Sequence, residues 1–479
     1  MLKICRKLDQ AGDWLALRQL TDDQAAVIGH PRALLFRLNA AVELRDQDLF
    51  DDIARTTLQL DGAENVKLLI VKKLSDVGQV ELALKILQAD IQMREHPRYL
   101  KVISKAQKNL KDGDLKRQFR EQADEASGGG SAIKAEASGF MFKPRRSDAP
   151  DFGTVQLSAA SSVAKHHLPA LEIQASVFRE GLAKATVRET FPTLNEFRDV
   201  FTDRNGQIWN ESGQIIRSKG RPIADVNRSS VQQLPIAMMS QSATRGIYHW
   251  IVDRLPRFAW LQEPANQADK VPILISDVAP QFEMTSLEMM GLAERAHLVG
   301  DAVFVERLIV PVVGFRNLVG WDHVDWAMNT MVSVSMQRAK EAGVQLDERL
   351  YISRRDAKRR TLLNEEAVEA GFKDRGFAVY EFSKIPLWQQ IALVYSAKVV
   401  AGPHGAGLSH LIFAKSGAKI IEIIPIKDGA YQLRFNYARL SIIKNLDYNG
   451  WLETQNLGVN DWSLDVAQFF DFVDTSLGK

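Results

Sequence analysis

Residues 398–413 read KVVAGPHGAGLSHLIF, and this stretch decides how the second half of the chain folds. It opens with a short apolar run that predicts a buried strand, and a second apolar run with helical spacing begins at Leu408. The turn between them is His404-Gly405-Ala406-Gly407. Such a turn can bind an anion, because free N–H groups and the positive end of the helix dipole face it. The stretch therefore indicates either a phosphate-binding turn or only a tight connection.

Strands and helices alternate on both sides of this turn. From residue 350 onward we expect strands near 350–353, 377–381, 398–401 and 419–424, separated by helices at 364–375, 386–396, 405–414 and 430–437. Upstream we expect helices at 248–262, 282–292 and 326–342, and strands at 271–276 and 305–310. Two successive units of this kind predict two parallel-sheet lobes with ligands at the carboxyl ends of the strands. A last helix, 464–475, is expected to cross back onto the first lobe.

The first 124 residues follow a different pattern, with apolar residues at three- and four-residue steps and no strand pattern. Similar turns precede amphipathic helices at Ala11-Gly12-Asp13, Asp46-Gln47-Asp48 and Val77-Gly78-Gln79. Their period of about 31 to 35 residues suits paired-helix repeats of the tetratricopeptide kind. Such a region is either a docking module for a partner or polymer, or a helical cap on the catalytic part.

A glycine-rich segment, Ser127-Gly128-Gly129-Gly130-Ser131, marks the clearest boundary. Residues 151–240 are irregular and β-rich, with hairpin signals at 203–207 and 211–213. The predicted domains are a helical domain at 1–124, a flexible linker at 125–150, and two lobes at 151–340 and 341–479.

Composition excludes several classes of protein. The 479 residues are 46% hydrophobic and 25% charged, as in ordinary globular domains, and a net charge of +2 gives no reason to expect nucleic acid. A single cysteine, Cys5, excludes a disulfide framework and a cysteine-rich zinc site. No run approaches the roughly 20 apolar residues that span a bilayer. We expect a cytoplasmic protein, either free or peripheral at the inner membrane.

Several motifs accompany the glycine turn in a fixed order. They are YHWIVDRLPR at 248–257, YISRRD at 351–356, QQI at 389–391 and IIEIIP at 420–425. With this order and spacing, residues 240–450 resemble glycosyltransferase family 61, whose bacterial members are often described as capsular polysaccharide biosynthesis proteins. The resemblance implies an α/β fold with a GT-B-like pair of Rossmann-type lobes, here preceded by an all-helical repeat-like domain. It also implies a hexosyl- or pentosyltransferase that uses a nucleotide sugar.

The second lobe offers positive charge for a diphosphate. Arg354 and Arg355 follow the strand 350–353, so they lie at a carboxyl end where ligands collect. An arginine fork can bind phosphate oxygens in a bidentate way. A solvated basic run is the alternative, and it is favoured for Arg359 and Arg360. For Arg354 the resemblance favours donor binding.

The glycine turn would complete the donor site. His404 and the N–H groups of Gly405, Ala406, Gly407 and Leu408 are expected to surround the diphosphate. Glu422 interrupts an apolar strand, and an unpaired buried carboxylate is costly. It therefore either faces the cleft, where a ribose hydroxyl would bind, or forms structural hydrogen bonds.

The first lobe offers a base. His249 and Asp253 are four residues apart, which places both on one face of a helix. A histidine oriented by a carboxylate can take a proton near neutral pH, and Asp253 could also act alone. The alternative is a structural pair that ties the helix to its neighbours. Two departures from the family weaken the parallel, because Gln389 replaces a frequent glutamate and the usual asparagine before His249 is missing.

We expect no metal and no cofactor. Asp-x-Asp patterns at 46–48 and 112–114 fall in the helical region, not after a strand. The leading hypothesis is an inverting, metal-independent transferase that uses a nucleotide sugar, a UDP-sugar above all, to build a cell-surface polysaccharide or a lipid-linked glycan. A nucleotide-using epimerase is disfavoured, because no Gly-x-Gly-x-x-Gly turn follows a strand of the first lobe. The remaining alternative is an inactive transferase-like scaffold that binds a protein partner through residues 1–124.

Overall fold

The chain forms two compact units in a computed structural model. The structure describes residues 1–90, 151–165, 167–187, 193–262, 270–312, 322–357, 361–427, 435–455 and 461–478. The first unit comprises Met1–Glu136, Phe197–Pro235 and Val299–Arg307, and the second comprises Ala137–Glu196, Ile236–Leu298 and Leu308–Lys479. The predicted linker at 125–150 lies outside the described residues.

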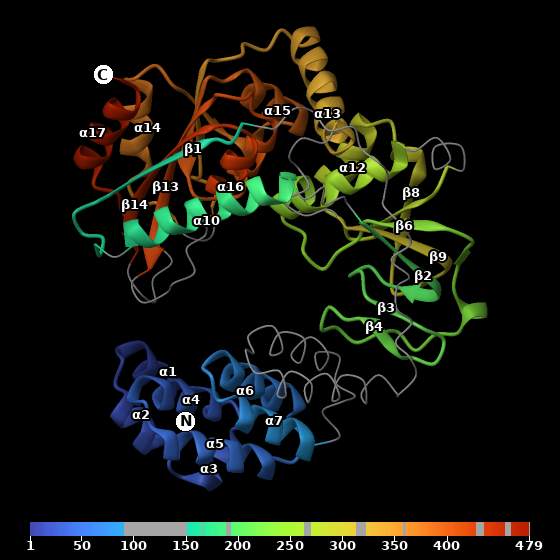
Figure 1. The fold of residues 1–479 in the computed structure, drawn as a ribbon, viewed down its shortest axis with the longest axis vertical. Coiled ribbons are helices and arrows are strands. Elements are labelled where there is room, and N and C mark those ends of the chain that lie inside the picture. The colour runs from blue at the N-terminus through green and yellow to red at the C-terminus, as the bar shows by residue number, and fades with distance from the viewer. Residues whose placement is uncertain are drawn as a thin grey trace. The chain divides into compact units, whose positions relative to one another are not determined.

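Residues 1–90 of the first unit are helical, which confirms the prediction for this part of 1–124. Their buried apolar faces, with Leu38, Ile53 and Ile70 fully enclosed, form one core. The helices are α1 (Leu2–Ala11), α2 (Trp14–Leu20), α3 (Gln24–Gly29), α4 (Ala33–Leu44), α5 (Gln47–Gln59), α6 (Glu64–Asp76) and α7 (Val80–Ala89), drawn in blue in Figure 1.

Each of the three predicted turns joins two helices that pack on each other, namely α1 with α2, α4 with α5 and α6 with α7. Gly12 and Gly78 have the positive φ that such turns need, 70° and 87°. Asp46 caps α5, because its carboxylate accepts from the N–H of Leu49 at 3.1 Å. Gln47, the first residue of α5, and Gln79, the N-cap of α7, exchange side-chain hydrogen bonds between two of these turns. These pairings agree with a repeat, which stays a prediction.

The remainder of the first unit contains short strands and hairpins. β3 (Ile208–Trp209) pairs antiparallel with β4 (Ile215–Arg217) and with the Phe201–Thr202 end of β2 (Thr193–Thr202). Both predicted hairpin turns form, with glycines at positive φ in each. β5 (Gln233–Leu234) pairs in parallel with β9 (Val303–Val312). Phe201, Trp209 and Phe304 make the small core of this region.

The second unit contains a six-stranded sheet in the order β1-β14-β13-β12-β10-β11, in which every neighbouring pair of strands is parallel. The four predicted strands of this region are confirmed. The sequence placed residues 154–159 in the other predicted lobe, but they form the edge strand β1 of this sheet, because β14 supplies a parallel partner. The strands are β1 (Thr154–Ala159), β10 (Arg349–Ser353), β11 (Ala378–Glu381), β12 (Val399–Pro403), β13 (Lys419–Lys427) and β14 (Asp447–Gln455).

Helices flank this sheet. α10 (His167–Val187) packs on β1 and α16 (Asn436–Ile443), and α13 (Asp322–Glu341) packs on α15 (Leu387–Ser396). α17 (Val466–Ser476) packs on α14 (Glu365–Lys373) and β14, and Figure 1 shows α14 and α17 side by side. The side chain of Gln468, on α17, also bonds the N–H and the hydroxyl of Ser161, which belongs to the first predicted lobe, so the expectation that the last helix crosses to that lobe stays a prediction.

Two interactions hold α17 in place. Arg375 makes two hydrogen bonds to the carboxylate of Asp474, at 2.7 and 2.6 Å, and its guanidinium lies over the ring of Phe470. Gly371 of α14 lets the same ring approach the helix backbone. α17 buries aromatic side chains that pack on the six-stranded sheet of the second unit. This packing explains why the helix lies on that sheet.

The rest of the second unit has a smaller parallel pairing. β6 (Ala237–Met239) pairs with β7 (Ile273–Ser276) and with Leu308–Ile309 of β9, and α12 (Gln281–Met289) follows β7. The helix predicted at 248–262 is not regular: a π-helical segment, η3 (His249–Arg254), continues into the 3₁₀ segment η4 (Leu255–Gln262). Pro256 contributes to this irregularity, because it lacks an N–H and cannot continue an α-helical ladder.

The α/β class is confirmed, whereas the GT-B arrangement stays a prediction. None of the helices in the described ranges has both the length and the apolar character needed to cross a membrane.

Replacing Gly371 with alanine should weaken the contact between α14 and α17. The new Cβ would lie 2.3 Å from two ring carbons of Phe470, and overpacking of this kind costs about 1–3 kcal/mol. Alanine at an unhindered helix position instead stabilises by about 0.5–1 kcal/mol. We expect a lower urea midpoint for Gly371→Ala and no loss for Gly29→Ala, whose Cβ meets nothing within 4 Å. Equal midpoints for both variants would contradict this packing.

Candidate functional site

The carboxyl ends of β10 and β12 bring Arg354 to the glycine turn. These strands pair in parallel, with Tyr351 opposite Ala401, so the residues that follow them meet at one edge. The guanidinium of Arg354 donates from Nη1 to the carbonyl oxygen of His404 at 2.7 Å. The structure therefore joins two predicted site residues that are 50 positions apart in the sequence.

Glycines in the turn make room for this approach. A Cβ on Gly405 would lie 1.4 Å from Nη1 of Arg354, and one on Gly407 would lie 2.7 Å from Cγ2 of Ile352. Gly405 has an extended backbone with φ of 177°, which any residue can adopt. The requirement for glycine at 405 therefore comes from the arginine side chain and not from backbone strain.

The helix after the turn differs from the prediction. Ala406–Phe413 is a 3₁₀ segment, η8, and not the α-helix expected at 405–414. Its hydrogen bonding uses one of the predicted donors, because the N–H of Leu408 donates to the carbonyl oxygen of Gly405 at 3.0 Å. Leu408 thus contributes its side chain to the site. The backbone N–H groups that the turn can offer to an anion are those of the residues before Leu408.

His404 is held by a buried carboxylate. Its Nδ1 lies 2.5 Å from Oε1 of Glu422, and the hydroxyl of Tyr448 donates to Oε2 at 2.6 Å. His404 and Glu422 are 6% and 1% exposed. Of the two interpretations left open for Glu422, this geometry favours the hydrogen-bonded group, which acts on a ligand only through His404. The Nδ1 side of the ring is fixed, so Nε2 is the nitrogen that can meet a ligand.

A second buried carboxylate holds the backbone of Arg354. Glu365, at the start of α14, accepts from the N–H of Arg354 at 2.5 Å and from the hydroxyl of Tyr351 at 3.3 Å. Burial raises the pKa of Glu365. The side chain of the preceding residue, Asn364, bonds the backbone of Leu464.

Arg355 points to a different partner. Its guanidinium binds both oxygens of Glu369 on α14, at 2.9 and 2.7 Å. This fork uses the geometry with which an arginine would bind a phosphate. Arg355 and Arg354 are therefore not equivalent, although they are adjacent in the sequence.

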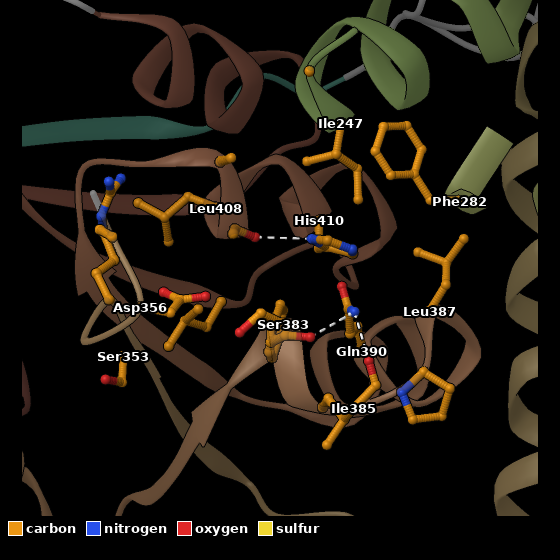
Figure 2. Close-up of a pocket in the computed structure, with 18 of the residues that line it drawn as sticks. Ile247, Phe282, Ser353, Asp356, Ser383, Ile385, Leu387, Gln390, Leu408 and His410 are labelled. Atoms are coloured by element: carbon orange, nitrogen blue, oxygen red, sulfur yellow. Dashed lines mark hydrogen bonds between the residues drawn. The ribbon is translucent and has the colours of Figure 1, made fainter. Parts of the chain in front are cut away.

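A cavity of about 790 Å³ opens at the strand ends of the second unit. This volume lies within the range usual for ligand pockets, about 300–1,000 Å³. Figure 2 shows its wall, which residues from 245–247, 281–285 and the segments around β10, β11 and β12 contribute. The polar lining includes Arg245, Thr285, Arg354, Asp356, Gln390 and His410, and Ala406, Gly407 and Leu408 line it as well.

The predicted contact between His249 and Asp253, the candidates for the catalytic base, is present. Nδ1 of His249 lies 2.7 Å from Oδ2 of Asp253, and the two side chains are 46% and 40% exposed. Both lie in the π-helical segment η3, an irregularity that is frequent at functional sites. Neither residue is part of the cavity wall, but the preceding Gly246 and Ile247 are.

A row of rings connects this pair to the glycine turn. Ring centroids are separated by 5.4 Å from His249 to Tyr248, 5.9 Å from Tyr248 to Tyr437 and 5.2 Å from Tyr437 to His404. Burial, followed by the charge of Asp253, raises the pKa of Tyr248, so its hydroxyl stays protonated. The structure thus places both predicted halves of the site within one unit.

Sequence reasoning missed His410. Its Nδ1 lies 2.9 Å from the carbonyl oxygen of Gly407, the ring is 1% exposed, and it belongs to the cavity wall. Burial lowers its pKa to about 4. A signal was present in the sequence, because a histidine interrupts the apolar run of 408–413. The sequence analysis also considered Gln389, whereas the neighbouring Gln390 lines the cavity.

Within the described ranges, no group of three or more His, Cys, Asp or Glu side chains could hold a metal ion. Asp46 serves as a helix cap, as described above. The predicted solvated residues Arg359 and Arg360 and the pattern at 112–114 lie outside the described residues.

Two comparisons with known proteins bear on the class of protein. Residues 247–421 match the family model Glycosyltransferase 61. The chain is also 26% identical over 142 residues to the EGF domain-specific O-linked N-acetylglucosamine transferase of Drosophila melanogaster. That match spans 26% of this chain and 26% of the relative. Both findings support a glycosyltransferase enzyme, and the family match includes Arg354, His404 and the His249–Asp253 pair.

The neutral state of His410 predicts an acid-dependent loss of stability. Its pKa falls from an ordinary 6.5 to about 4 on folding, so only the unfolded chain binds this proton between those values. The free energy of unfolding should therefore fall as pH drops through this window, by up to about 1.4 kcal/mol per pH unit. Urea unfolding at several pH values should show a shallower slope for His410→Phe. Identical slopes, or an imidazole NMR shift in the folded protein that titrates near 6.5, would contradict it.

Proposed function

We propose that the chain is an inverting glycosyltransferase that uses a nucleotide sugar, in particular a UDP-sugar, and needs no metal ion. One observation carries the proposal: Arg354 is fixed against the glycine turn at the carboxyl ends of two parallel strands, on the wall of a cavity large enough for a nucleotide. The family match over the same residues supports it.

The donor diphosphate would bind between Arg354 and residues 404–407. The guanidinium supplies a permanent positive charge, and its position is set by His404 and Gly405. The His404 side chain and the N–H groups of Gly405, Ala406 and Gly407 would add hydrogen bonds, whereas the His404 N–H already donates to the carbonyl oxygen of Ile423. Together these groups could stabilise the charge that builds up on a departing diphosphate, which is the role a metal ion has in other transferases.

The base would come from the His249–Asp253 pair. In the transfer, the acceptor hydroxyl attacks the anomeric carbon, the bond to the diphosphate oxygen breaks, and the base takes the hydroxyl proton. With Asp253 at Nδ1, the neutral imidazole carries its proton there and presents a basic Nε2. Asp253 acting alone is the alternative. Attack from the side opposite the leaving diphosphate gives inversion.

The two lobes would have separate roles. We assign 341–479, with residues 404–422, to the nucleotide sugar, and 151–340, with the His249–Asp253 pair, to the acceptor. The cavity wall supports this division, because it contains residues from both segments. The acceptor is proposed to be a saccharide or lipid-linked glycan in cell-surface polysaccharide or glycoconjugate synthesis. A capsular role and a cytoplasmic location stay predictions.

The helical residues 1–90 support a second, independent role. The contact between Gln47 and Gln79 links matching turns of two helix pairs, as expected of stacked repeats that bind a partner. An inactive scaffold built on this region is the alternative function. Hydrolysis of a UDP-sugar by the wild type, lost in Arg354→Ala, would exclude it.

Removing Arg354, or displacing it, should weaken nucleotide binding. We expect calorimetry to show UDP binding that EDTA does not affect, and a loss of about 1.5–3 kcal/mol in Arg354→Ala, as for a charged hydrogen bond. Gly405→Ala should have a similar effect, because its methyl group would occupy the position of Nη1.

The double variant provides the control. If Gly405→Ala acts by displacing the arginine, it should add little to Arg354→Ala, since both changes remove the same contact. Full additivity, with intact secondary structure by circular dichroism, would show that Gly405 does not act through Arg354. No UDP binding by the wild type would overturn the proposed function.

Changes at the base should affect turnover and not donor binding. Asp253→Asn and His249→Gln should lower kcat by about 10²–10⁴-fold, the usual contribution of general base catalysis. UDP affinity should stay at the wild-type value, because neither side chain lines the cavity. The variant with the larger loss identifies the base. Wild-type kcat in both variants would exclude the pair from catalysis.

A further inference from the structure

One part of the cavity wall presents only hydrogen-bond acceptors. It consists of the amide oxygen of Gln390, on α15, and Nε2 of His410, on η8; we call these two atoms the acceptor pair. Both residues line the cavity, and α15 packs on η8. Figure 2 shows the Gln390 amide oxygen turned towards the side of the cavity where His410 lies.

The amide of Gln390 has a fixed orientation. Its Nε2 donates to two backbone carbonyl oxygens, those of Phe382 at 2.8 Å and Ile385 at 2.9 Å. A primary amide has two N–H groups, so both are used. Rotating the amide would place its oxygen against two carbonyl oxygens. Oε1 therefore remains an acceptor on the cavity side.

The tautomer of His410 is fixed in the same way. Nδ1 lies 2.9 Å from the carbonyl oxygen of Gly407, which can only accept, so Nδ1 carries the proton. Burial keeps the ring neutral. Nε2 then has a lone pair, and it has no hydrogen-bond partner among the described residues. A buried acceptor without a partner costs about 1–3 kcal/mol, which a donating ligand group would recover.

The surroundings favour a flat, largely apolar ligand group. Phe382 contacts the His410 ring edge-on, with centroids 5.1 Å apart, and Ile385, Leu387 and Phe282 line the same cavity. In Figure 2, Ser353 and Asp356, next to Arg354, lie on one side of the cavity, and Gln390 and His410 lie towards the other. A nucleotide whose diphosphate meets Arg354 would thus extend its base towards the acceptor pair.

We propose that Gln390 and His410 recognise the ring N–H of a uracil-type base, and so select the nucleotide of the donor. The inference rests on the proposed function. Uracil carries an N–H at ring position 3, whereas cytosine has a lone pair there, which would face the lone pair of His410. A site built to bond an N–H discriminates against analogues that lack it, because its buried polar atoms stay unpaired.

The test compares UDP, N3-methyl-UDP, CDP and pyrophosphate by calorimetry. The wild type should bind UDP about 5- to 150-fold more tightly than N3-methyl-UDP, the ratio that corresponds to one buried hydrogen bond. CDP should bind more weakly than UDP, because cytosine has no N–H at ring position 3 and only its exocyclic amino group can donate. The affinity for pyrophosphate reports on binding at the Arg354 end of the cavity alone.

The variant His410→Phe keeps an aromatic ring next to Phe382 but removes the acceptor. It should bind UDP and N3-methyl-UDP with nearly equal affinity, while its affinity for pyrophosphate stays close to the wild-type value. Ser409→Ala is the matched control, because Ser409 is a buried polar residue of the same helix that does not line the cavity. Ser409→Ala should keep the full wild-type preference for UDP over N3-methyl-UDP.

Equal binding of UDP and N3-methyl-UDP by the wild type would overturn the inference, and this comparison needs no variant. Discrimination that persists in His410→Phe would also overturn it for His410. A His410→Phe effect seen only with a UDP-sugar and not with UDP would assign the acceptor pair to a sugar hydroxyl instead. Failure of the wild type to bind either UDP or pyrophosphate is a different result, which overturns the proposed function itself.

Discussion

The guanidinium of Arg354 donates to the carbonyl oxygen of His404 across the ends of β10 and β12, and the arrangement of the site depends on this contact. It requires parallel strands whose carboxyl ends meet, and a residue at 405 without a side chain. The permanent charge of the arginine then lies beside the turn that starts η8. Positive charge and backbone N–H groups are thereby concentrated at one point of the cavity, which is what a diphosphate needs.

Two buried carboxylates hold Arg354 and His404 in place. Glu365 binds the backbone of Arg354, and Glu422 binds the ring of His404. An isolated buried carboxylate is expensive, but each of these accepts at least two hydrogen bonds that offset the cost. In the proposed site they would fix groups that touch a ligand. Gln390 and His410 are held in a similar way, because their donors are bound to backbone carbonyls, and both residues line the cavity.

Local patterns in the sequence predicted much of this structure. Although the helix expected at 405–414 is a 3₁₀ segment, the strands around 350, 378, 399 and 419, the helices α14 and α15, the hairpin at Asn205-Gly206 and the helical character of residues 1–90 all formed as expected. So did the His249–Asp253 contact, because four residues in a helical segment bring two side chains together. The main error concerns a partner that is distant in sequence, because β1 pairs with β14, almost 300 residues away.

The sequence by itself determined the elements and the chemistry available to the site: a glycine turn after a strand, arginines at a strand end, and a histidine four residues before an aspartate. Those features are local, so periodicity and spacing can show them. Only the tertiary structure decided whether residues that are adjacent in the sequence have the same role. Arg354 reaches the cavity while Arg355 is bound by Glu369, and Glu422 bonds His404 and Tyr448. It also revealed His410, because burial and the carbonyl of Gly407 set its tautomer. The identity of a hydrogen-bond partner depends on packing between distant segments, which no local pattern encodes.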